Sequence, residues 1–356
     1  MPFISKITIT QFKNYDFASF DFPERVTGIC GLNGKGKTNL LDAIYYLCFA
    51  KSYFTKNDLL NTQSGKDGFR LEAKEENHSI VCINRGAGKK ELYVDGVGYT
   101  KLSEHVGRFP AVMIAPDDVE LITGASEERR RYLDTLLSQI DAVYLRQLIV
   151  YNKVLQQRNS LLKRFAETGT TDWPLLETID EQLIAPGNYI HQKRKELTAT
   201  AIPLVNKFYL QIAGRDEMAV LQYESQLNET DFYSLLNVCR QKDFLLQRSN
   251  GGIHKDEISI TLNGQPFKNT ASQGQRKSLL FALKLAEFEI LKTYKGSPPL
   301  LLLDDIFEKL DSNRMQQLLH WVCMENTGQA FITDTHLTRL QQALAAFGTA
   351  FHVVEL

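Results

Sequence analysis

The 356-residue sequence lacks the long apolar runs that would carry it through a membrane. A membrane-spanning helix needs about 20 consecutive apolar residues, and no run in this chain reaches that length. The N-terminal stretch MPFISK also lacks the apolar segment of a secretory signal peptide. We therefore expect a cytoplasmic protein without a membrane partner.

Cysteine is scarce, and a strong net charge of either sign is missing. The five cysteines are odd in number, widely spaced and set among apolar residues, which is typical of a reducing compartment and argues against a cysteine metal site. The formal net charge is −1, so any DNA contact must come from a local basic surface. The sequence also lacks repeats of fixed period and low-complexity segments. One large or two medium globular domains are therefore expected.

What the sequence does contain is a glycine-rich phosphate-binding motif. Residues 31–38 read GLNGKGKT, which fits the P-loop pattern G-x-x-x-x-G-K-[ST], or Walker A, between an apolar strand (26–30) and a helical pattern (39–47). Glycines let the N–H groups of such a loop approach an anion, and the following helix adds its dipole. Lys37 is expected to reach the β- and γ-phosphates of ATP, and the Thr38 hydroxyl to face Mg²⁺. The predicted ATP-binding residues are Gly31, Leu32, Asn33, Gly34, Lys35, Gly36, Lys37, Thr38 and Asn39.

Hydrophobic periodicity predicts an α/β fold in three stretches. Residues 1–122 alternate as strands, with a hairpin turn at Asp95-Gly96, and predict part of an ATPase head that includes an antiparallel sheet. Residues 123–242 show helical spacing over 127–137, 144–165, 175–199 and 201–212, with kinks or breaks at Pro186 and Pro203, and predict an inserted helical arm domain. Residues 243–356 predict the remainder of the head, where strands and helices alternate around a parallel core sheet.

A polar turn, Phe12-Lys13-Asn14-Tyr15, precedes the P-loop by two strands. Its position allows it to flank the base of a nucleotide bound at the P-loop. A plain hairpin turn between strands 4–10 and 17–22 explains the same residues equally well. The sequence leaves both interpretations open.

A second acidic motif follows the apolar run Leu300-Leu301-Leu302-Leu303. Such a run is typical of a central parallel strand buried on both faces. Asp304 and Asp305 come directly after it, and ligands of doubly wound sheets bind at the carboxyl ends of the strands. We therefore expect Asp304 to hold Mg²⁺ beside the P-loop as a Walker-B carboxylate, and Asp305 to orient the attacking water. Lys37 and Asp305 are the predicted catalytic residues.

A third motif, Ser272-Gln273-Gly274-Gln275, opens a long amphipathic helix. In isolation, a serine at this position is most simply an N-cap. The order of the motifs favours a further role, because the helix N-terminus that suits a cap also suits a γ-phosphate. Since the chain's own P-loop should already enclose its phosphates, we expect Ser272 to reach the ATP of a second copy. This interpretation predicts an ATP-dependent homodimer.

Taken together, these motifs resemble the ABC-type ATPase heads of the SMC class. Within that class the match is narrower, because several segments along the chain are similar to bacterial RecF proteins. They are Asn14-Tyr15, residues 33–44, 129–134 (RRRYLD), 157–163 (QRNSLLK) and 252–257 (GIHKDE). The resemblance implies ATP-driven dimerisation on DNA and weak, DNA-dependent ATP hydrolysis in recombinational gap repair and replication restart. It also implies RecR and RecO as partners and recombinase loading as the outcome.

The resemblance also suggests two further site elements and includes departures. It implies a D-loop with Leu310 and Asp311 after Walker B, and a switch at Thr335 and His336. ABC ATPases usually place Glu after the Walker-B Asp, whereas Asp305 is one methylene shorter, which favours slow turnover. No glutamine stands after Ile114, where a Q-loop residue is expected.

Basic residues cluster along the predicted helical arm. A solvated helix face explains each cluster alone, but a dimer would gather two copies of each around DNA. Phosphate contacts would then bind duplex or gapped DNA without reading sequence. The predicted DNA-binding residues are Arg129, Arg130, Arg131, Arg158, Lys163, Arg164, Lys193, Arg194 and Lys195.

Three other classes share part of this pattern. A membrane-transporter cassette has the same site chemistry, but the helical insertion is foreign to it. An SMC-like structural protein needs long heptad arms, and about 120 inserted residues are too few to supply them. A P-loop kinase is disfavoured by the signature serine.

Overall fold

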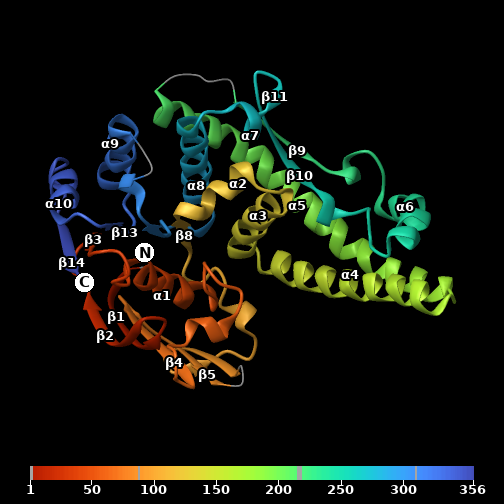
Figure 1. Ribbon diagram of the computed structural model, residues 1–356, viewed down its shortest axis with the longest axis horizontal. Coiled ribbons are helices and arrows are strands. Elements are labelled where there is room, and N and C mark those ends of the chain that lie inside the picture. Colours follow the sequence, from red (N-terminus) through yellow and green to blue (C-terminus); the bar gives the residue numbers. More distant parts are fainter. Residues whose placement is uncertain (1–2, 87–88, 215–218, 309–310) are drawn as a thin grey trace. The chain divides into compact units, whose positions relative to one another are not determined.

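The computed structural model describes residues 3–86, 89–214, 219–308 and 311–356. The chain divides into two compact units, shown as a ribbon in Figure 1. The first unit comprises Met1–Asp118, Lys207–Asp216 and Ser272–Leu356, and the second comprises Val119–Asn206 and Glu217–Ala271. Residues 243–271, which the sequence assigned to the head, therefore group with the helical unit. Among the described residues, no helix is long and apolar enough to cross a bilayer.

A five-stranded parallel sheet forms the centre of the first unit. The order is β14-β3-β13-β12-β8, and each neighbouring pair is parallel. All residues of the four strands other than β14 are buried, which explains their continuous apolar runs. The strands are β3 (Val26–Cys30), β8 (Ala111–Ile114), β12 (Leu300–Leu303), β13 (Ala330–Asp334) and β14 (Phe351–Glu355).

Strand register aligns the carboxyl ends of this sheet. Cys30 at the end of β3 pairs with Asp334 at the end of β13, and Leu303 at the end of β12 pairs with Ile332 and Ile114. The residues that follow β3 and β12 therefore emerge at one edge. The predicted α/β core is confirmed, including the placement of the P-loop and the paired aspartates at the same edge.

Four helices of the first unit connect or flank these strands. They are α1 (Lys37–Phe49), α8 (Gln273–Lys295), α9 (Ser312–His320) and α10 (Leu337–Ala345). Helix α10 lies close to β3, where a Cβ atom on Gly28 would stand 2.8 Å from the Leu340 Cδ2 atom. A larger residue at position 28 would push α10 away from the strand that leads into the P-loop.

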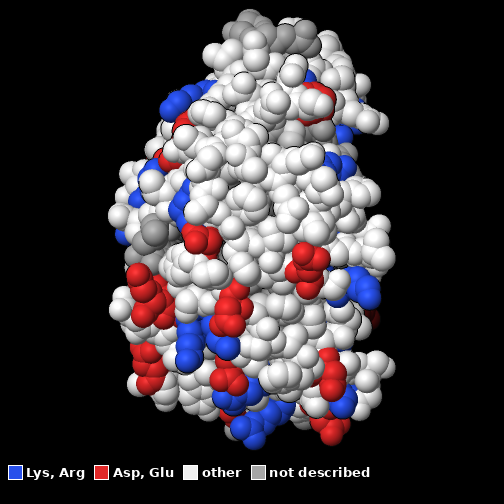
Figure 2. All heavy atoms as spheres, turned by 90° about the vertical axis from the view of Figure 1, so that its left-hand side faces the viewer, with Lys and Arg blue, Asp and Glu red and all other residues white. Residues whose placement is uncertain are grey.

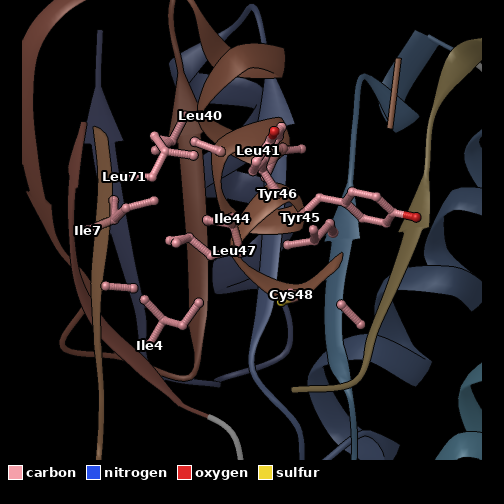
Figure 3. Packing of buried hydrophobic residues seen from close by; sticks show 14 of the residues in the cluster. Ile4, Ile7, Leu40, Leu41, Ile44, Tyr45, Tyr46, Leu47, Cys48 and Leu71 are labelled. Carbon is pink, nitrogen blue, oxygen red and sulfur yellow. The ribbon is translucent and has the colours of Figure 1, made fainter. Parts of the chain in front are cut away.

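A second sheet of the first unit is antiparallel, with the order β2-β1-β4-β5-β6-β7. Its apolar face packs on α1: Ile7 and Leu71 from the strands meet Leu40 and Ile44 from the helix in one buried cluster (Figure 3). The P-loop helix is thus held from the side of this sheet. The strands are β1 (Ile4–Phe12), β2 (Tyr15–Asp21), β4 (Gly68–Glu75), β5 (His78–Arg85), β6 (Lys89–Val94) and β7 (Val97–Gly98).

The second unit is mainly helical and also contains a small sheet. Its helices are α2 (Glu120–Thr123), α3 (Ser126–Ile140), α4 (Ala142–Thr168), α6 (Phe232–Leu246) and α7 (Phe267–Thr270), with most of α5 (Trp173–Ala213). The antiparallel strands are β9 (Ala219–Glu224), β10 (Glu257–Leu262) and β11 (Gln265–Pro266), in the order β11-β10-β9.

Two expectations for this region were wrong. The helices predicted over 175–199 and 201–212 are one continuous helix, α5, with Pro186 and Pro203 inside it. Each proline removes one backbone donor, and a helix of 41 residues retains enough bonds and packing to tolerate that loss. Strand β9 lies in a region that was expected to be helical. It forms by pairing with β10, which is distant in the sequence, so the local pattern did not indicate a strand.

Arg158, one of the predicted DNA-binding residues, is buried inside the second unit. Its side chain is 0% exposed. Its Nε atom donates to Asp180 Oδ1 at 2.5 Å, and its Nη1 atom donates to Asp243 Oδ2 at 2.6 Å and to Ser249 Oγ at 2.8 Å. The DNA-contact prediction is therefore wrong for Arg158, whose guanidinium is used to neutralise two buried carboxylates.

The DNA-contact prediction is also wrong for Arg194 and Arg129, because both side chains are buried and paired. Arg194 is 1% exposed, and its guanidinium binds Asp134 and Asp256, both at 2.8 Å, and the Ile253 carbonyl. Arg129 is also buried and pairs with both oxygens of Glu257, at 2.6 and 2.9 Å. Three of the nine predicted DNA contacts thus tie the helical unit together internally.

The buried Arg158 cluster predicts a large stability effect. Arg158→Met should lower the free energy of unfolding by about 3–5 kcal/mol, because Asp180 and Asp243 would stay buried without their cation. Urea unfolding followed by circular dichroism measures the change. Lys163→Met, on the exposed side of the same helix, is the control and should stay within about 0.5 kcal/mol of the parent. A loss below about 1 kcal/mol for Arg158→Met would contradict the assignment.

Candidate functional site

The P-loop begins at the end of β3 and ends in the first turn of α1. Gly34 and Gly36 have positive φ angles of 83° and 112°, a region that favours glycine. Gly36 is the N-cap of α1 and has no side chain, so no side-chain cap occupies the first N–H groups of the helix. The Lys37 Nζ atom donates to the Gly31 carbonyl at 2.8 Å. This arrangement provides backbone donors and one cation for a phosphate chain.

The turn between β1 and β2 holds this loop in place. Asn14 Nδ2 donates to the Lys35 carbonyl at 3.2 Å, and the Tyr15 hydroxyl donates to the Gly36 carbonyl at 3.1 Å. Asn39 Nδ2 in turn donates to Asn14 Oδ1 at 2.7 Å. A Cβ atom on Gly36 would lie 2.7 Å from both the Asn14 Nδ2 and Tyr15 hydroxyl atoms, so this close approach also requires glycine. The turn is thus a hairpin that supports the phosphate loop, a role that neither open interpretation contained.

Asp304 meets the P-loop directly. The Thr38 hydroxyl donates to the Asp304 carboxylate, with distances of 2.9 Å to Oδ2 and 3.1 Å to Oδ1. Asp304 is 3% exposed and also accepts a hydrogen bond from the Thr333 hydroxyl at 2.9 Å. The two motifs are 266 residues apart in the sequence, and the sheet brings them into contact. The contact brings the two predicted metal ligands side by side, and metal binding by them stays a prediction.

Thr333 is a site residue that the sequence interpretation missed. Its hydroxyl donates to Asp304 and accepts the backbone N–H of Asp305 at 2.8 Å. Asp305 adopts a positive φ of 46°, so its backbone turns away from the strand direction immediately after Asp304. Thr333 therefore fixes the orientation of both aspartates. The available signal was its place at the end of the next apolar strand.

The ionisation of Asp304 reflects its burial. Burial raises the pKa of its carboxyl group to about 6 and the nearby Asp305 charge adds to the rise, whereas hydrogen bonds from Thr333 and Thr38 lower it. A threonine hydroxyl and a carboxylate are the hard oxygen donors that Mg²⁺ prefers. Across the described part of the chain, no group of three or more His, Cys, Asp or Glu could hold a metal ion. A cation at this edge would therefore use Thr38, Asp304 and phosphate oxygens.

The predicted switch residues, Thr335 and His336, directly follow a buried acid, Asp334. Asp334 is 2% exposed, accepts the N–H groups of Thr335 at 2.6 Å and His336 at 3.3 Å, and pairs with Arg339. Its backbone carbonyl accepts the Gly31 N–H at 3.3 Å, which connects β13 to the start of the P-loop. His336 is exposed and makes no side-chain cap bond. A switch role for Thr335 and His336 stays a prediction.

The signature motif forms a complete helix cap. Ser272 Oγ accepts the Gln275 N–H at 3.2 Å, and Gln275 Oε1 accepts the Ser272 N–H at 2.8 Å. This capping box opens α8 and leaves Ser272 exposed. Asp311 similarly caps α9, whereas Leu310 of the predicted D-loop lies outside the described residues. The predicted trans role of the motif concerns a second copy and stays a prediction.

The remaining basic candidates of the second unit are more accessible. Lys163, Arg164 and Lys195 are exposed, and Arg131 and Lys193 pair with Glu128 and Glu196 on their own helices. Arg130 donates to the Asp256 carbonyl at 2.7 Å.

A different face of the molecule is drawn in Figure 2. There acidic and basic side chains lie intermixed, and no large patch of one sign is visible. This distribution agrees with the net charge of −1. This face therefore offers no large basic patch to a nucleic acid.

Comparison with known proteins gives a consistent result. The family described as RecF/RecN/SMC N terminal domain matches residues 3–354. Proteins described as DNA replication and repair protein RecF from Flavobacterium johnsoniae and Cytophaga hutchinsonii are 42% and 41% identical, and the alignments cover 99% and 95% of this chain and 99% and 90% of those proteins.

Solved structures extend the similarity. The structure described as the recombination mediator protein RecF-ATP in the RecFOR pathway has a TM-score of 0.85 and 30% identity, and covers 94% of this chain and 92% of that chain. An Smc head domain from Pyrococcus furiosus, with 16% identity, a TM-score of 0.55 and coverage of 98% of this chain and 92% of its own, shows the fold alone.

The raised pKa of Asp304 predicts that its ionised carboxylate lowers the free energy of unfolding. Its ordinary value is 3.8, so ionised Asp304 lowers stability above about pH 6, and protonation below about pH 4 removes the penalty. Without nucleotide or Mg²⁺, Asp304→Asn should therefore raise the free energy of unfolding by about 1–2 kcal/mol at pH 8, and the gain should vanish near pH 4. Urea unfolding at both pH values measures it, with the exposed Asp16→Asn as control. A gain that is independent of pH would contradict the assignment.

Proposed function

The chain belongs to the RecF family of DNA replication and repair proteins, and we propose that it is an ATP-gated DNA clamp. In this proposal, ATP with Mg²⁺ drives head-to-head dimerisation on DNA, and slow hydrolysis releases the dimer. The observation that carries it is the contact of Thr38 with Asp304, which unites the phosphate loop and the acidic strand end in one site. Gap repair and replication restart in the cytoplasm are the proposed setting.

The residues of this site have separate roles in hydrolysis. The loop N–H groups and Lys37 bind the phosphates, and Thr38 and Asp304 would hold Mg²⁺, which neutralises charge on the phosphate oxygens. Asp305 orients the water that attacks the γ-phosphate. Its side chain is one methylene shorter than the glutamate usual at this position, so a water held by Asp305 is less well aligned. Slow turnover suits a protein whose ATP-bound state is the working state.

The second copy is needed to complete the site. Ser272 is exposed at the N-terminus of α8, where the helix dipole favours an anion. We propose that Ser272 of each protomer binds the γ-phosphate held by the other P-loop. ATP then joins the two heads, and its hydrolysis removes the phosphate that bridges them.

Helix α4 supplies the best-supported DNA surface. No Asp or Glu occurs between Ala142 and Ala166, and the exposed basic residues are Arg146, Lys153, Lys163 and Arg164. Arg146 and Arg164 are 18 positions apart, which is five turns and places them on one face over about 27 Å. That length spans roughly eight phosphates of one DNA strand. Contacts of this kind give affinity for duplex or gapped DNA without sequence preference.

RecR and RecO are the proposed protein partners, and recombinase loading is the proposed outcome. The support is the close similarity to a recombination mediator of the RecFOR pathway, which covers nearly the whole of both chains.

Three substitutions test the ATP-dependent dimer. Lys37→Arg should weaken the response to nucleotide, Asp305→Asn should trap the ATP-bound dimer, and Ser272→Arg should bind ATP but stay monomeric. Sedimentation velocity with ATP, Mg²⁺ and DNA measures the three outcomes. Ser272→Thr is the matched control, because it retains a capping hydroxyl and should still dimerise. If Ser272→Arg dimerises as the parent does, the proposed trans site fails.

The α4 surface predicts a change in the salt dependence of DNA binding. Replacing Lys163 and Arg164 with glutamine should reduce the slope of log affinity against log salt by about 1.8 per protomer, because two phosphate contacts are lost. Fluorescence anisotropy with a gapped duplex, ATP and a salt series measures it. The control replaces Lys6 and Lys66, which pair with Asp21 and Asp16 on the antiparallel sheet. Equal slopes for both double variants would contradict the assignment.

A further inference from the structure

Gly274 in the signature motif has no backbone reason to be glycine. It is the second residue of α8, and its φ angle is not among the positive values found in the described residues. Glycine is also a poor helix former, so alanine would favour the helix more. Neither the φ angle nor helix propensity therefore favours glycine here, and the neighbouring side chain is the remaining feature of its surroundings.

The side chain of Arg314 occupies the space next to Gly274. A Cβ atom built on Gly274 would stand 2.0 Å from Arg314 Nη1 and 3.0 Å from Arg314 Cζ. The guanidinium thus takes the place that a side chain at position 274 would fill. Gly274 and Arg314 are complementary across two helices, α8 and α9.

Arg314 is held in this position by Asp311. The Asp311 Oδ1 atom accepts the Arg314 N–H at 3.0 Å as the cap of α9, and Asp311 Oδ2 lies 3.4 Å from Arg314 Nη1. The Arg314 side chain is 17% exposed, whereas that of Asp311 is 58% exposed. One guanidinium therefore packs against the start of the signature helix and pairs with Asp311, the acid of the predicted D-loop.

The charge of Arg314 is unusual for its location. Cations normally stabilise helix C-termini, whereas this one lies at the N-terminus of α8, where the dipole is already positive. The exposed Asp311 carboxylate compensates it only in part, because solvent screens that pair. The combined positive potential favours an incoming anion on the side where Ser272 is exposed.

We propose that Arg314 is a positioning residue for the signature. Its guanidinium packs against Gly274 at the N-terminus of α8 and pairs with Asp311, so that Ser272 and Asp311 of one protomer reach the triphosphate of the other together. This role rests on the proposed ATP-dependent dimer. It predicts that Arg314 affects closure of the dimer and not ATP binding at the P-loop of its own chain.

The full-length chain with ATP, Mg²⁺ and DNA provides the test. Arg314→Ala should weaken ATP-dependent dimerisation about tenfold or more and lower kcat, while the KM for ATP changes less than about twofold. Arg314→Lys should recover part of the loss, because it restores the charge without the planar fork. Lys292→Ala, which removes a charge from the far end of α8, is the control and should behave as the parent.

A double-mutant cycle separates positioning from general destabilisation. A methyl group in Gly274→Ala should displace the flexible guanidinium, so Gly274→Ala and Arg314→Ala should weaken dimerisation by similar factors, and the double variant should be no weaker than either. If the two substitutions weakened dimerisation by factors that multiply in the double variant, the role of Arg314 would be overturned and the proposed dimer would stand. The same holds if Arg314→Ala dimerises as the parent does. A parent chain that fails to dimerise with ATP would overturn the proposed function and this inference with it. The melting temperature of each variant should stay near that of the parent. A melting temperature that falls in step with dimerisation would overturn the role of Arg314, because general destabilisation would then explain the loss.

Discussion

One contact, between the Thr38 hydroxyl and the Asp304 carboxylate, depends on the whole architecture of the first unit. Two segments 266 residues apart can meet only if β3, β13 and β12 are adjacent, parallel and in the observed register. A slip of one residue would turn Asp304 to the other face of the sheet. The contact is also costly, because Asp304 is buried and its pKa is raised to about 6. In the proposed site, a cation that arrives with the nucleotide would compensate this buried charge.

The surroundings of this contact act as supports. Thr333 holds Asp304 and Asp305 from the neighbouring strand, and the β1–β2 turn holds the loop through Asn14 and Tyr15. The same hairpin belongs to the antiparallel sheet whose apolar face covers α1. Both sheets of the first unit therefore determine the geometry of one loop. The antiparallel sheet thus supports the loop although it contributes no predicted phosphate ligand.

Sequence patterns predicted this unit well because its signals are local. A glycine loop, a leucine run and a capping serine each report on their own segment, and the rules of parallel sheets then place them at one edge. Arg158 was misassigned because a run of basic residues does not reveal which way each side chain points. The correct signal was periodicity: Arg158 lies on the same stripe of α4 as the buried Tyr151, Val154, Leu161 and Phe165. Strand β9 and the support from Thr333 depend on distant partners, and no local pattern encodes them.

The two interpretations of Ser272, as a helix cap and as a phosphate ligand, are compatible in chemical terms. A serine hydroxyl has one donor and two acceptor sites. In the capping box Ser272 Oγ uses an acceptor site for the Gln275 N–H, and its own proton is not needed there. A γ-phosphate requires a donor, so it can accept that proton without breaking the cap. In the proposed dimer, the capping box would fix the position of the Ser272 oxygen before a second copy arrives and so remove part of the entropy cost of closing the site.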